Sequence, residues 1–273
     1  MDWRLIVPKE GTLTKEETDA AYEIRLRCGQ PLQLFGPRGQ RTGSWPLTQE
    51  SIRLAAQALT GHSLSMHETQ LKEGFVPLPG GPRMGVCGHM GKNGLYVFSS
   101  LCVRMAHEKK DAAETIYPLV KGENVLILGP PGSGKTTLLR DLIRRTAQEK
   151  QVAVIDSRGE IAACFQGVPQ LDIGPGSDVM TGGRKDEMMM TMLRAMSPQV
   201  MAADEIGSTE DTSALLEMHR CGVKVMATAH GDSLAQARGR QSLTPLFDTG
   251  VFRFVLLLSC PGHAPRCIDL CEK

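Results

Sequence analysis

The chain has 273 residues, enough for one large domain or two ordinary ones, and its 41% hydrophobic and 22% charged residues are typical of a globular protein. Its 31 basic and 30 acidic residues give a formal net charge of +1, so the bulk charge does not favour nucleic acid or an anionic membrane as a partner. We expect neither a secretory signal nor a membrane span, because the most apolar window, residues 251–259, is far shorter than the roughly 20 residues of a spanning helix.

The first third of the sequence predicts a small α+β domain over residues 1–106. Gly and Pro cluster at 36–39 and 77–82 and separate short segments, several of which alternate polar and apolar residues. A helix is predicted over 52–59, preceded by Thr48, and residues 107–122, which are charged and carry Pro118, are predicted to be a linker. The predicted strands are residues 23–27, 31–35, 95–99 and 101–104.

The remaining residues, 123–273, predict an α/β domain. Short apolar runs alternate with helical segments, which is typical of a mainly parallel sheet with helices on both faces. Ser208 and Asp211 predict a capping box at the start of the last predicted helix. The predicted strands are residues 125–128, 152–155, 200–203, 223–227 and 251–257, and the predicted helices are 135–148, 186–196 and 209–221.

A glycine-rich segment follows the first of these strands and reads Gly-Pro-Pro-Gly-Ser-Gly-Lys-Thr, the pattern of a phosphate-binding P-loop. Such a loop brings backbone N–H groups to the β- and γ-phosphates, and it needs glycine where a Cβ would block the approach. We expect Lys135 to reach these phosphates and Thr136 to bind Mg²⁺, with the N-terminus of the next helix facing the anion. The predicted ATP-binding residues are Gly129, Pro130, Pro131, Gly132, Ser133, Gly134, Lys135, Thr136 and Thr137.

Two carboxylates, Asp204 and Glu205, follow the predicted strand 200–203. A P-loop enzyme needs one carboxylate near Mg²⁺ and usually a second residue that orients or deprotonates the attacking water. We expect Asp204 to contribute to ATP and Mg²⁺ binding, largely through water, and Glu205 to be the general base, with Lys135 also catalytic. The sequence therefore predicts an ATPase that converts ATP and water to ADP and phosphate.

Polar residues also follow two other predicted strands, where open α/β sheets bind their ligands. Asp156-Ser-Arg-Gly-Glu160 follows the strand 152–155, and Thr228-Ala-His230 follows the strand 223–227. We predict that Glu160 and His230 sense the γ-phosphate or orient water. An ordinary loop or helix cap is the alternative at each position.

Arginines are candidates for meeting the charge that develops on the γ-phosphate, often from a neighbouring subunit. We include Arg194 among the predicted catalytic residues. A solvated surface arginine is the alternative at each position. The other candidates are Arg158 and Arg184 in the second predicted domain and Arg83 and Arg104 in the first.

The eight cysteines are scattered and form no Cys-x-x-Cys pair, which in a chain with a cytosolic nucleotide motif favours reduced thiols. The segment Cys260-Pro-Gly-His263, with Cys267 and Cys271, contains residue types that bind zinc. Its spacings match no standard zinc signature, so a zinc site is the less favoured alternative.

In this order these features resemble the secretion-type P-loop ATPases, the motors of type II and type IV secretion and of pilus assembly. Residues 156–160 resemble the acidic box of that family, residues 193–200 resemble its approach to the Walker B strand, and residues 228–230 resemble its histidine box. The resemblance covers nearly the whole chain and implies a RecA-like core after a small N-terminal domain. The chain departs from the family pattern at Asp204, where glycine is usual, and at Gly207, where a basic residue is usual.

A closer resemblance, to the stage III sporulation protein AA family, rests on residues 23–32, 83–86, 99–104, 138–144 and 196–207. It implies an ATP- and Mg²⁺-dependent homo-oligomer, a hexameric ring, on the cytoplasmic face of the membrane in the mother cell of an endospore former. The implied function is the motor of a secretion-like channel from mother cell to forespore, with an inner-membrane platform protein as partner. In such a ring Arg83 or Arg104 is expected to approach nucleotide held by a neighbour.

Two other functions stay open on the residues alone. The main alternative is a nucleic-acid-dependent P-loop ATPase, although only 4% of the residues are aromatic and no basic stripe with interleaved stacking residues is present, so no nucleic acid is expected. The other is a nucleotide-binding scaffold without turnover, which the presence of Glu205 disfavours.

Overall fold

The computed structural model describes residues 15–61, 64–67, 70–71, 74–90, 96–106 and 108–272. The chain forms two compact units, the first made of Met1–His107 with Phe165–Gln170 and the second of Glu108–Cys164 with Leu171–Lys273. Each unit is built around its own β-sheet and its own buried apolar residues, as expected of separate domains.

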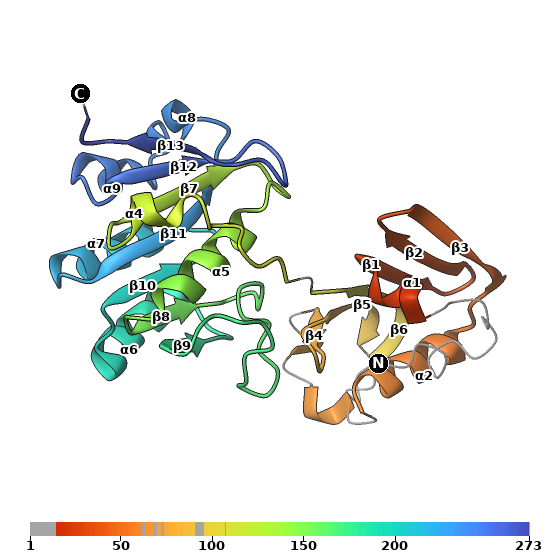
Figure 1. The fold of residues 1–273 in the computed structure, drawn as a ribbon. Helices are drawn as coiled ribbons and strands as arrows, with labels where there is room; N and C mark the ends of the chain where they lie inside the picture. The colour runs from red at the N-terminus through yellow and green to blue at the C-terminus, as the bar shows by residue number, and fades with distance from the viewer. Residues whose placement is uncertain are drawn as a thin grey trace. The chain divides into compact units, whose positions relative to one another are not determined.

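The first unit contains a six-stranded antiparallel sheet with the strand order β3-β2-β1-β6-β5-β4 (Figure 1). Polar and apolar residues alternate in β1, so Ile24 and Leu26 are fully buried on one face of the sheet. The strands are β1 (Glu23–Arg27), β2 (Pro31–Gly36), β3 (Gly39–Pro46), β4 (Phe75–Pro77), β5 (Arg83–Met90) and β6 (Tyr96–Arg104), accompanied by the short helices α1 (Lys15–Asp19) and η2 (Leu64–His67).

Helix α2 (Gln49–Leu59) packs its apolar side, which includes Ile52 and Leu59, into the same core. The Thr48 side chain accepts a hydrogen bond from the Ser51 backbone N–H at 3.1 Å and so caps the helix. The helix predicted over 52–59 is confirmed and is one turn longer. The two strands predicted at 95–99 and 101–104 are one strand, β6, with Leu95 outside the described residues.

Three strands of this sheet were not predicted from the sequence. Strand β3 is almost entirely exposed and contains no run of apolar residues, so it has no hydrophobic period to recognise. It exists because it pairs with β2, and β4 and β5 likewise pair with each other and with β6.

The second unit contains a seven-stranded sheet with the order β13-β12-β7-β11-β10-β8-β9, in which only the edge strand β13 is antiparallel (Figure 1). The prediction of a mainly parallel sheet is confirmed. The edge strands β9 and β13, which are half-buried or exposed rather than buried, were not predicted. The strands are β7 (Val125–Gly129), β8 (Val152–Ile155), β9 (Ser177–Met180), β10 (Val200–Ala203), β11 (Lys224–His230), β12 (Phe254–Leu257) and β13 (Arg266–Asp269).

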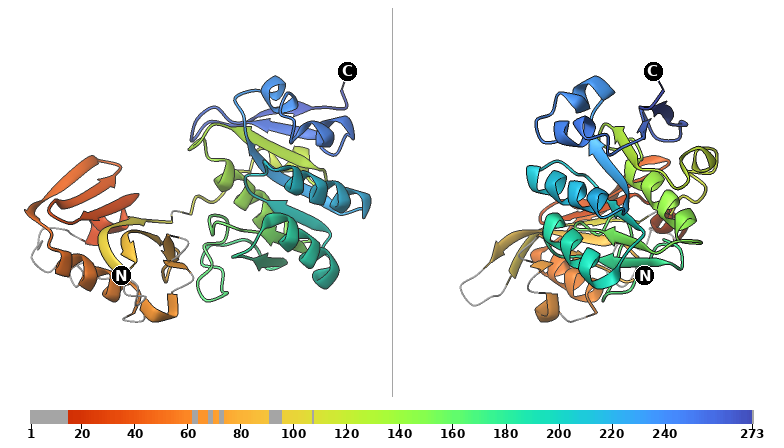
Figure 2. Two further views of the ribbon diagram at one scale, coloured as in Figure 1. Left: turned by 180° about the vertical axis from the view of Figure 1, so that it is seen from behind. Right: turned by 90° about the vertical axis from the view of Figure 1, so that its left-hand side faces the viewer.

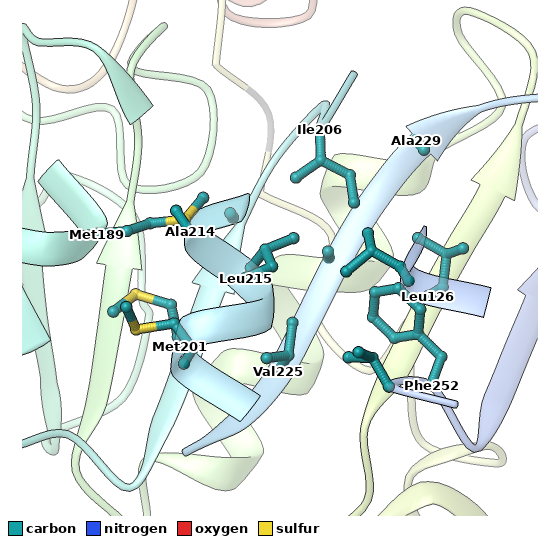
Figure 3. Close-up of a cluster of buried hydrophobic side chains, with 14 of the residues drawn as sticks. Leu126, Met189, Met201, Ile206, Ala214, Leu215, Val225, Ala229 and Phe252 are labelled. Atoms are coloured by element: carbon teal, nitrogen blue, oxygen red, sulfur yellow. The ribbon is translucent and has the colours of Figure 1, made fainter. Parts of the chain in front are cut away.

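Helices cover both faces of this sheet (Figures 1 and 2). Alternate residues of each central strand enter different cores: Leu126 packs with α6 and α7, whereas Ile127 packs with α5. In the first of these cores Met189 of α6 lies beside Ala214 of α7, and Leu215 of α7 lies near Val225 of β11 (Figure 3). The helices are α4 (Tyr117–Val120), α5 (Lys135–Thr146), α6 (Lys185–Met196), α7 (Thr209–Arg220), α8 (Leu234–Arg238) and α9 (Thr244–Asp248).

The segment predicted to be a linker, residues 107–122, differs from that expectation from Glu108 onward. Ala113, Ile116 and Val120 are buried in the core that faces α5. The Ala113 backbone N–H donates to the buried carboxylate of Asp141 at 2.8 Å, which ties the segment to the helix after the P-loop. Sequence periodicity did not show this because single apolar residues between charged ones form no repeating pattern.

Candidate functional site

The P-loop connects β7 to α5, and its glycines are required by the geometry. A Cβ on Gly129 would lie 2.7 Å from the carbonyl oxygen of Leu258, which follows the neighbouring strand β12. Gly132 and Gly134 have φ values of +74° and +96°, which side chains rarely adopt. Ser133 is buried, and its Oγ atom has no hydrogen-bond partner among the described residues.

Lys135 is folded back over the loop that precedes it. Its Nζ atom donates to the carbonyl oxygens of Gly129 at 2.9 Å and Pro130 at 2.8 Å and lies 3.5 Å from Nδ1 of His230. Only 6% of Lys135 is exposed, and this burial lowers the pKa of the ammonium group, although the nearby carboxylate of Asp204 acts in the opposite direction. The ammonium group of Lys135 therefore lies against the P-loop carbonyls and beside His230.

Asp204 lies immediately after β10 and faces the first turn of α5. Its Oδ2 atom accepts a hydrogen bond from the Thr136 hydroxyl at 2.7 Å, and its Oδ1 atom accepts one from the Thr228 hydroxyl. A carboxylate and two hydroxyl groups are the hard oxygen donors that Mg²⁺ prefers, and Mg²⁺ usually keeps several waters, so these residues fit the ion. No cluster of three or more His, Cys, Asp or Glu side chains suited to a metal occurs in the described part of the chain.

Glu205 turns the chain sharply at the end of β10. Its φ is +52°, a conformation that costs about 1–2 kcal/mol in a residue with a Cβ. The surrounding residues hold this conformation, because the Glu205 N–H donates to Thr228 Oγ1 at 2.8 Å and Lys185 Nζ donates to the Glu205 carbonyl oxygen. The turn directs the Glu205 side chain toward the ends of the neighbouring strands.

The carboxylate of Glu205 contacts two basic side chains. Its Oε2 atom pairs with Nη1 of Arg158, from the loop after β8, and its Oε1 atom lies 3.2 Å from Nε2 of His230, at the end of β11. Because the ammonium of Lys135 only donates, Nδ1 of His230 accepts, and a neutral imidazole then carries its proton on Nε2, facing Glu205. Burial first, and then the charges of Lys135, Arg240 and Arg158, lower the pKa of His230 and favour this neutral form.

The loop after β8 is held by two buried charged residues, Asp156 and Arg140. The carboxylate of Asp156 accepts hydrogen bonds from the backbone N–H groups of Glu160, Ile161 and Ala162 at 2.8, 3.1 and 2.9 Å. Arg140 of α5 donates to the carbonyl oxygens of Glu160 and Ile161 at 2.6 and 2.5 Å. Burial raises the pKa of Asp156, which these backbone bonds oppose, and burial lowers the pKa of Arg140.

The structure brings most of the predicted site residues together and leaves Arg194 apart. Lys135, Thr136, Asp204, Glu205 and His230 form one connected group at the carboxyl ends of β7, β10 and β11. The other predicted ATP-binding residues lie at the end of β7, in the P-loop or in the first turn of α5. They are Gly129, Pro130, Pro131, Gly132, Ser133, Gly134 and Thr137.

Glu160 is held through its backbone, and Arg194 lies apart on α6. The backbone of Glu160 is bound by Asp156 and Arg140, while a different side chain of its loop, that of Arg158, reaches Glu205. Arg194 is exposed near the end of α6, nine residues or about 13 Å along the helix from Lys185, and lines a groove between α6 and α7. Within one chain Arg194 is therefore remote from the P-loop, so its predicted role requires a neighbouring subunit.

Three residues of the site escaped the sequence prediction as functional groups. Thr228 was noted only as part of the Thr-Ala-His segment, although a polar residue within an apolar strand was a usable signal, and it is fully buried. The usable signal for Arg140 was a charged residue among the apolar residues that α5 buries. No pattern in the sequence pointed to Lys185, because its contact with Glu205 depends on the packing of α6 against β8 and α7.

Cys260, Cys267 and Cys271, the candidates for a zinc site, belong to no cluster of three or more metal-binding side chains among the described residues. Cys260 Sγ lies 3.0 Å from Nδ1 of His263 in the loop before β13, and all eight cysteines of the chain are free thiols. Separately, no helix in the described residues is both long enough and apolar enough to cross a bilayer.

Comparisons with known sequences and structures bear on the family and the fold. The family described as "Sporulation stage III, protein AA" matches residues 7–270. Stage III sporulation protein AA of Bacillus subtilis (strain 168) is 39% identical over 265 residues, which cover 90% of this chain and 86% of that protein. Protein SEEDLING PLASTID DEVELOPMENT 1 of Arabidopsis thaliana is 32% identical over 136 residues, which cover 48% of this chain and 20% of that protein.

Two solved structures share the fold at low sequence identity. The ATPase DotB of Legionella pneumophila superposes with a TM-score of 0.59 at 18% identity, covering 88% of this chain and 73% of that one. The pilus retraction motor PilT, crystallised with bound ADP, superposes with a TM-score of 0.63 at 14% identity, covering 93% of this chain and 79% of that one. The fold is therefore that of the RecA-like secretion ATPases.

Proposed function

The chain belongs to the sporulation stage III protein AA family, and from that membership and the geometry of its site we propose that it is an ATP-hydrolysing motor of a secretion-like membrane complex. The observation that carries the proposal is the connected group formed by the P-loop, Asp204 and Glu205, in which Thr136 and Asp204 meet at 2.7 Å. A scaffold that only binds nucleotide has no need of a second carboxylate held beside the first in a strained backbone conformation.

In the proposed reaction the P-loop binds the β- and γ-phosphates of ATP through its backbone N–H groups, and Lys135 exchanges its loop carbonyl partners for phosphate oxygens. Thr136 and, through water, Asp204 would hold Mg²⁺, which neutralises charge on the phosphates. Glu205 accepts a proton from the attacking water, and neutral His230 orients that carboxylate through its Nε2–H.

Phosphate release by the purified chain tests the chemistry. We expect Glu205→Gln to lower the rate of phosphate release by about 10²- to 10⁴-fold, the usual contribution of a general base, while ATP binding is retained. Lys135→Ala should instead weaken binding of both ATP and ADP. A matched control is Glu217→Gln, because Glu217 is a partly exposed helix residue that pairs with Arg220.

The assay also separates the rival functions. Turnover that rises strongly only when single-stranded DNA or RNA is added would favour the nucleic-acid-dependent ATPase. Binding of ATP without phosphate release, alone and with every candidate membrane partner, would contradict the enzyme.

The cellular part of the proposal goes further than the chemistry. We propose that the chain assembles into a hexameric ring on the cytoplasmic face of the mother-cell membrane, where hydrolysis drives a platform protein of the channel to the forespore. Family membership supports the sporulation setting, and the fold shared with DotB and PilT supports a motor. Mass photometry with ATP should give a species of six chains, and a chain that stays monomeric at all concentrations would contradict the ring.

A further inference from the structure

The ion pair between Arg158 and Glu205 conflicts with the proposed role of Glu205 as the general base. In the proposed reaction Glu205 must accept a proton from water, yet one of its carboxylate oxygens pairs with a guanidinium and the other faces His230. A carboxylate bound by a cation is a weaker base, because the positive charge favours its ionised form. The pair therefore has to open, or be weakened, before Glu205 acts.

Arg158 is placed to change partners. It lies in the loop after β8, next to the strand that carries Asp204 and Glu205, and 59% of its side chain is exposed. The loop backbone directly after Arg158 is fixed by hydrogen bonds, because Asp156 and Arg140 bind the backbone of residues 160–162. A long, flexible side chain on a fixed base can swing between two nearby anions without moving the loop.

The γ-phosphate is the second anion that such a cation meets. Lys135 and Glu205 both contact His230, so the P-loop cation and the Glu205 carboxylate lie on opposite sides of one imidazole ring. A triphosphate bound through Lys135 ends close to Glu205, whereas a diphosphate is one phosphoryl group shorter. A guanidinium group binds phosphate oxygens through two parallel N–H···O hydrogen bonds, as it binds a carboxylate.

We propose that Arg158 is a triphosphate-sensing residue of the same chain, which leaves Glu205 for the γ-phosphate when ATP binds and thereby frees Glu205 to act as the base. This inference rests on the proposed function. It assigns to Arg158 the discrimination between ATP and ADP, and it makes the Arg158–Glu205 pair a latch on the general base.

Binding of two nucleotides tests this assignment in the full-length chain with Mg²⁺. Titrations with ADP and with a non-hydrolysable ATP analogue give two dissociation constants for each variant. We expect Arg158→Gln to weaken binding of the ATP analogue by about 5- to 20-fold and to change ADP binding by less than twofold, since only the γ-phosphate loses a partner. Arg220→Gln, which removes an exposed arginine of a surface pair at the end of α7, should change neither.

The Glu205→Gln variant tests the competition itself. Without the Glu205 charge Arg158 has no carboxylate to leave, so the ATP analogue should bind several-fold more tightly while ADP binding is unchanged. In the Arg158→Gln background the same change should give a clearly smaller gain, and the difference between the two gains measures the coupling of the two residues.

The outcomes separate this inference from the proposed function. Equal weakening of ADP and ATP-analogue binding by Arg158→Gln, or no weakening of either, overturns the sensing role although the chain still binds nucleotide. Equal gains from Glu205→Gln in both backgrounds overturn the latch. A wild-type chain that binds neither nucleotide overturns the proposed function and the inference with it.

Discussion

At the scale of single residues, the site depends on a threonine that contacts both of its acidic residues, one through the side chain and one through the backbone. Thr228 lies fully buried in β11, donates its hydroxyl proton to Asp204 and accepts the backbone N–H of Glu205. One hydroxyl group thus fixes both the side chain of Asp204 and the strained backbone of Glu205. Such a group is a positioning residue, since it contacts the Asp204 carboxylate and the Glu205 backbone rather than the substrate.

Replacing this threonine by valine should separate position from chemistry. Thr228→Val keeps the shape of the side chain but leaves the Glu205 N–H and one oxygen of Asp204 without their partner. We expect phosphate release to fall by about 10- to 100-fold, with ADP affinity within about twofold, because a displaced general base loses much of its effect. Thr228→Ser, which keeps the hydroxyl, should retain most of the activity, and full activity in Thr228→Val would contradict the positioning role.

At the scale of secondary-structure elements, the parallel sheet is held at the amino ends of three strands by one buried amide. The Asn124 side chain, just before β7, donates to the Val251 carbonyl oxygen at 2.7 Å and accepts from the Val225 N–H of β11 at 2.8 Å. The Asn124 backbone carbonyl also accepts from the Phe254 N–H of β12 at 3.2 Å. The residue therefore fixes the relative positions of strands whose other ends carry the site.

Asn124→Ala should destabilise the second unit by about 3 kcal/mol, because two buried backbone groups lose their partners at about 1–3 kcal/mol each. Both tryptophans of the chain, Trp3 and Trp45, precede residue 108 in the sequence, where the second unit begins, so urea unfolding of that unit must be followed by circular dichroism. Gln148→Ala, which removes an exposed amide bonded to the Arg144 carbonyl at 3.2 Å, is the control and should change the free energy of unfolding by less than about 0.5 kcal/mol. A loss below 1 kcal/mol for Asn124→Ala would contradict this account.

At the scale of the whole molecule, the boundary of the second unit lies before the segment once expected to be a linker. Besides its buried apolar residues, the segment places Asp111 against Arg144 and Arg145 of α5 at 3.0 and 2.7 Å. These contacts make residues 108–122 part of the unit that holds the P-loop, and they connect that segment to the helix that begins at Lys135.

Two fragments should distinguish these boundaries. A chain of residues 108–273 is expected to unfold cooperatively and to bind ADP as the full-length chain does. A chain of residues 123–273 loses Ala113, Ile116 and Val120 from its core and should be less stable by about 4 kcal/mol, judged from the apolar area lost. Equal thermal midpoints for the two fragments would show that the segment contributes nothing to the fold.

The P-loop, the central parallel strands and the helices α5, α6 and α7 could be predicted from the sequence. These features are local: a buried parallel strand is a continuous apolar run, a helix shows its own period and caps, and the P-loop glycines are needed for backbone shape alone. Asp204, Glu205 and His230 were found for a related reason, since the carboxyl ends of neighbouring parallel strands meet at one edge.

The contacts of Asp204, Glu205 and His230 could be seen only in the folded chain. The sequence placed Arg158 and Glu205 on separate loops, 47 positions apart, and nothing local indicated that they pair. The positive φ of Glu205, the role of Thr228 and the packing of residues 108–122 also depend on elements brought together by the sheet order β7-β11-β10-β8. Strand order depends on how both faces of the sheet pack, and the sequence of one strand does not specify which strands will lie beside it.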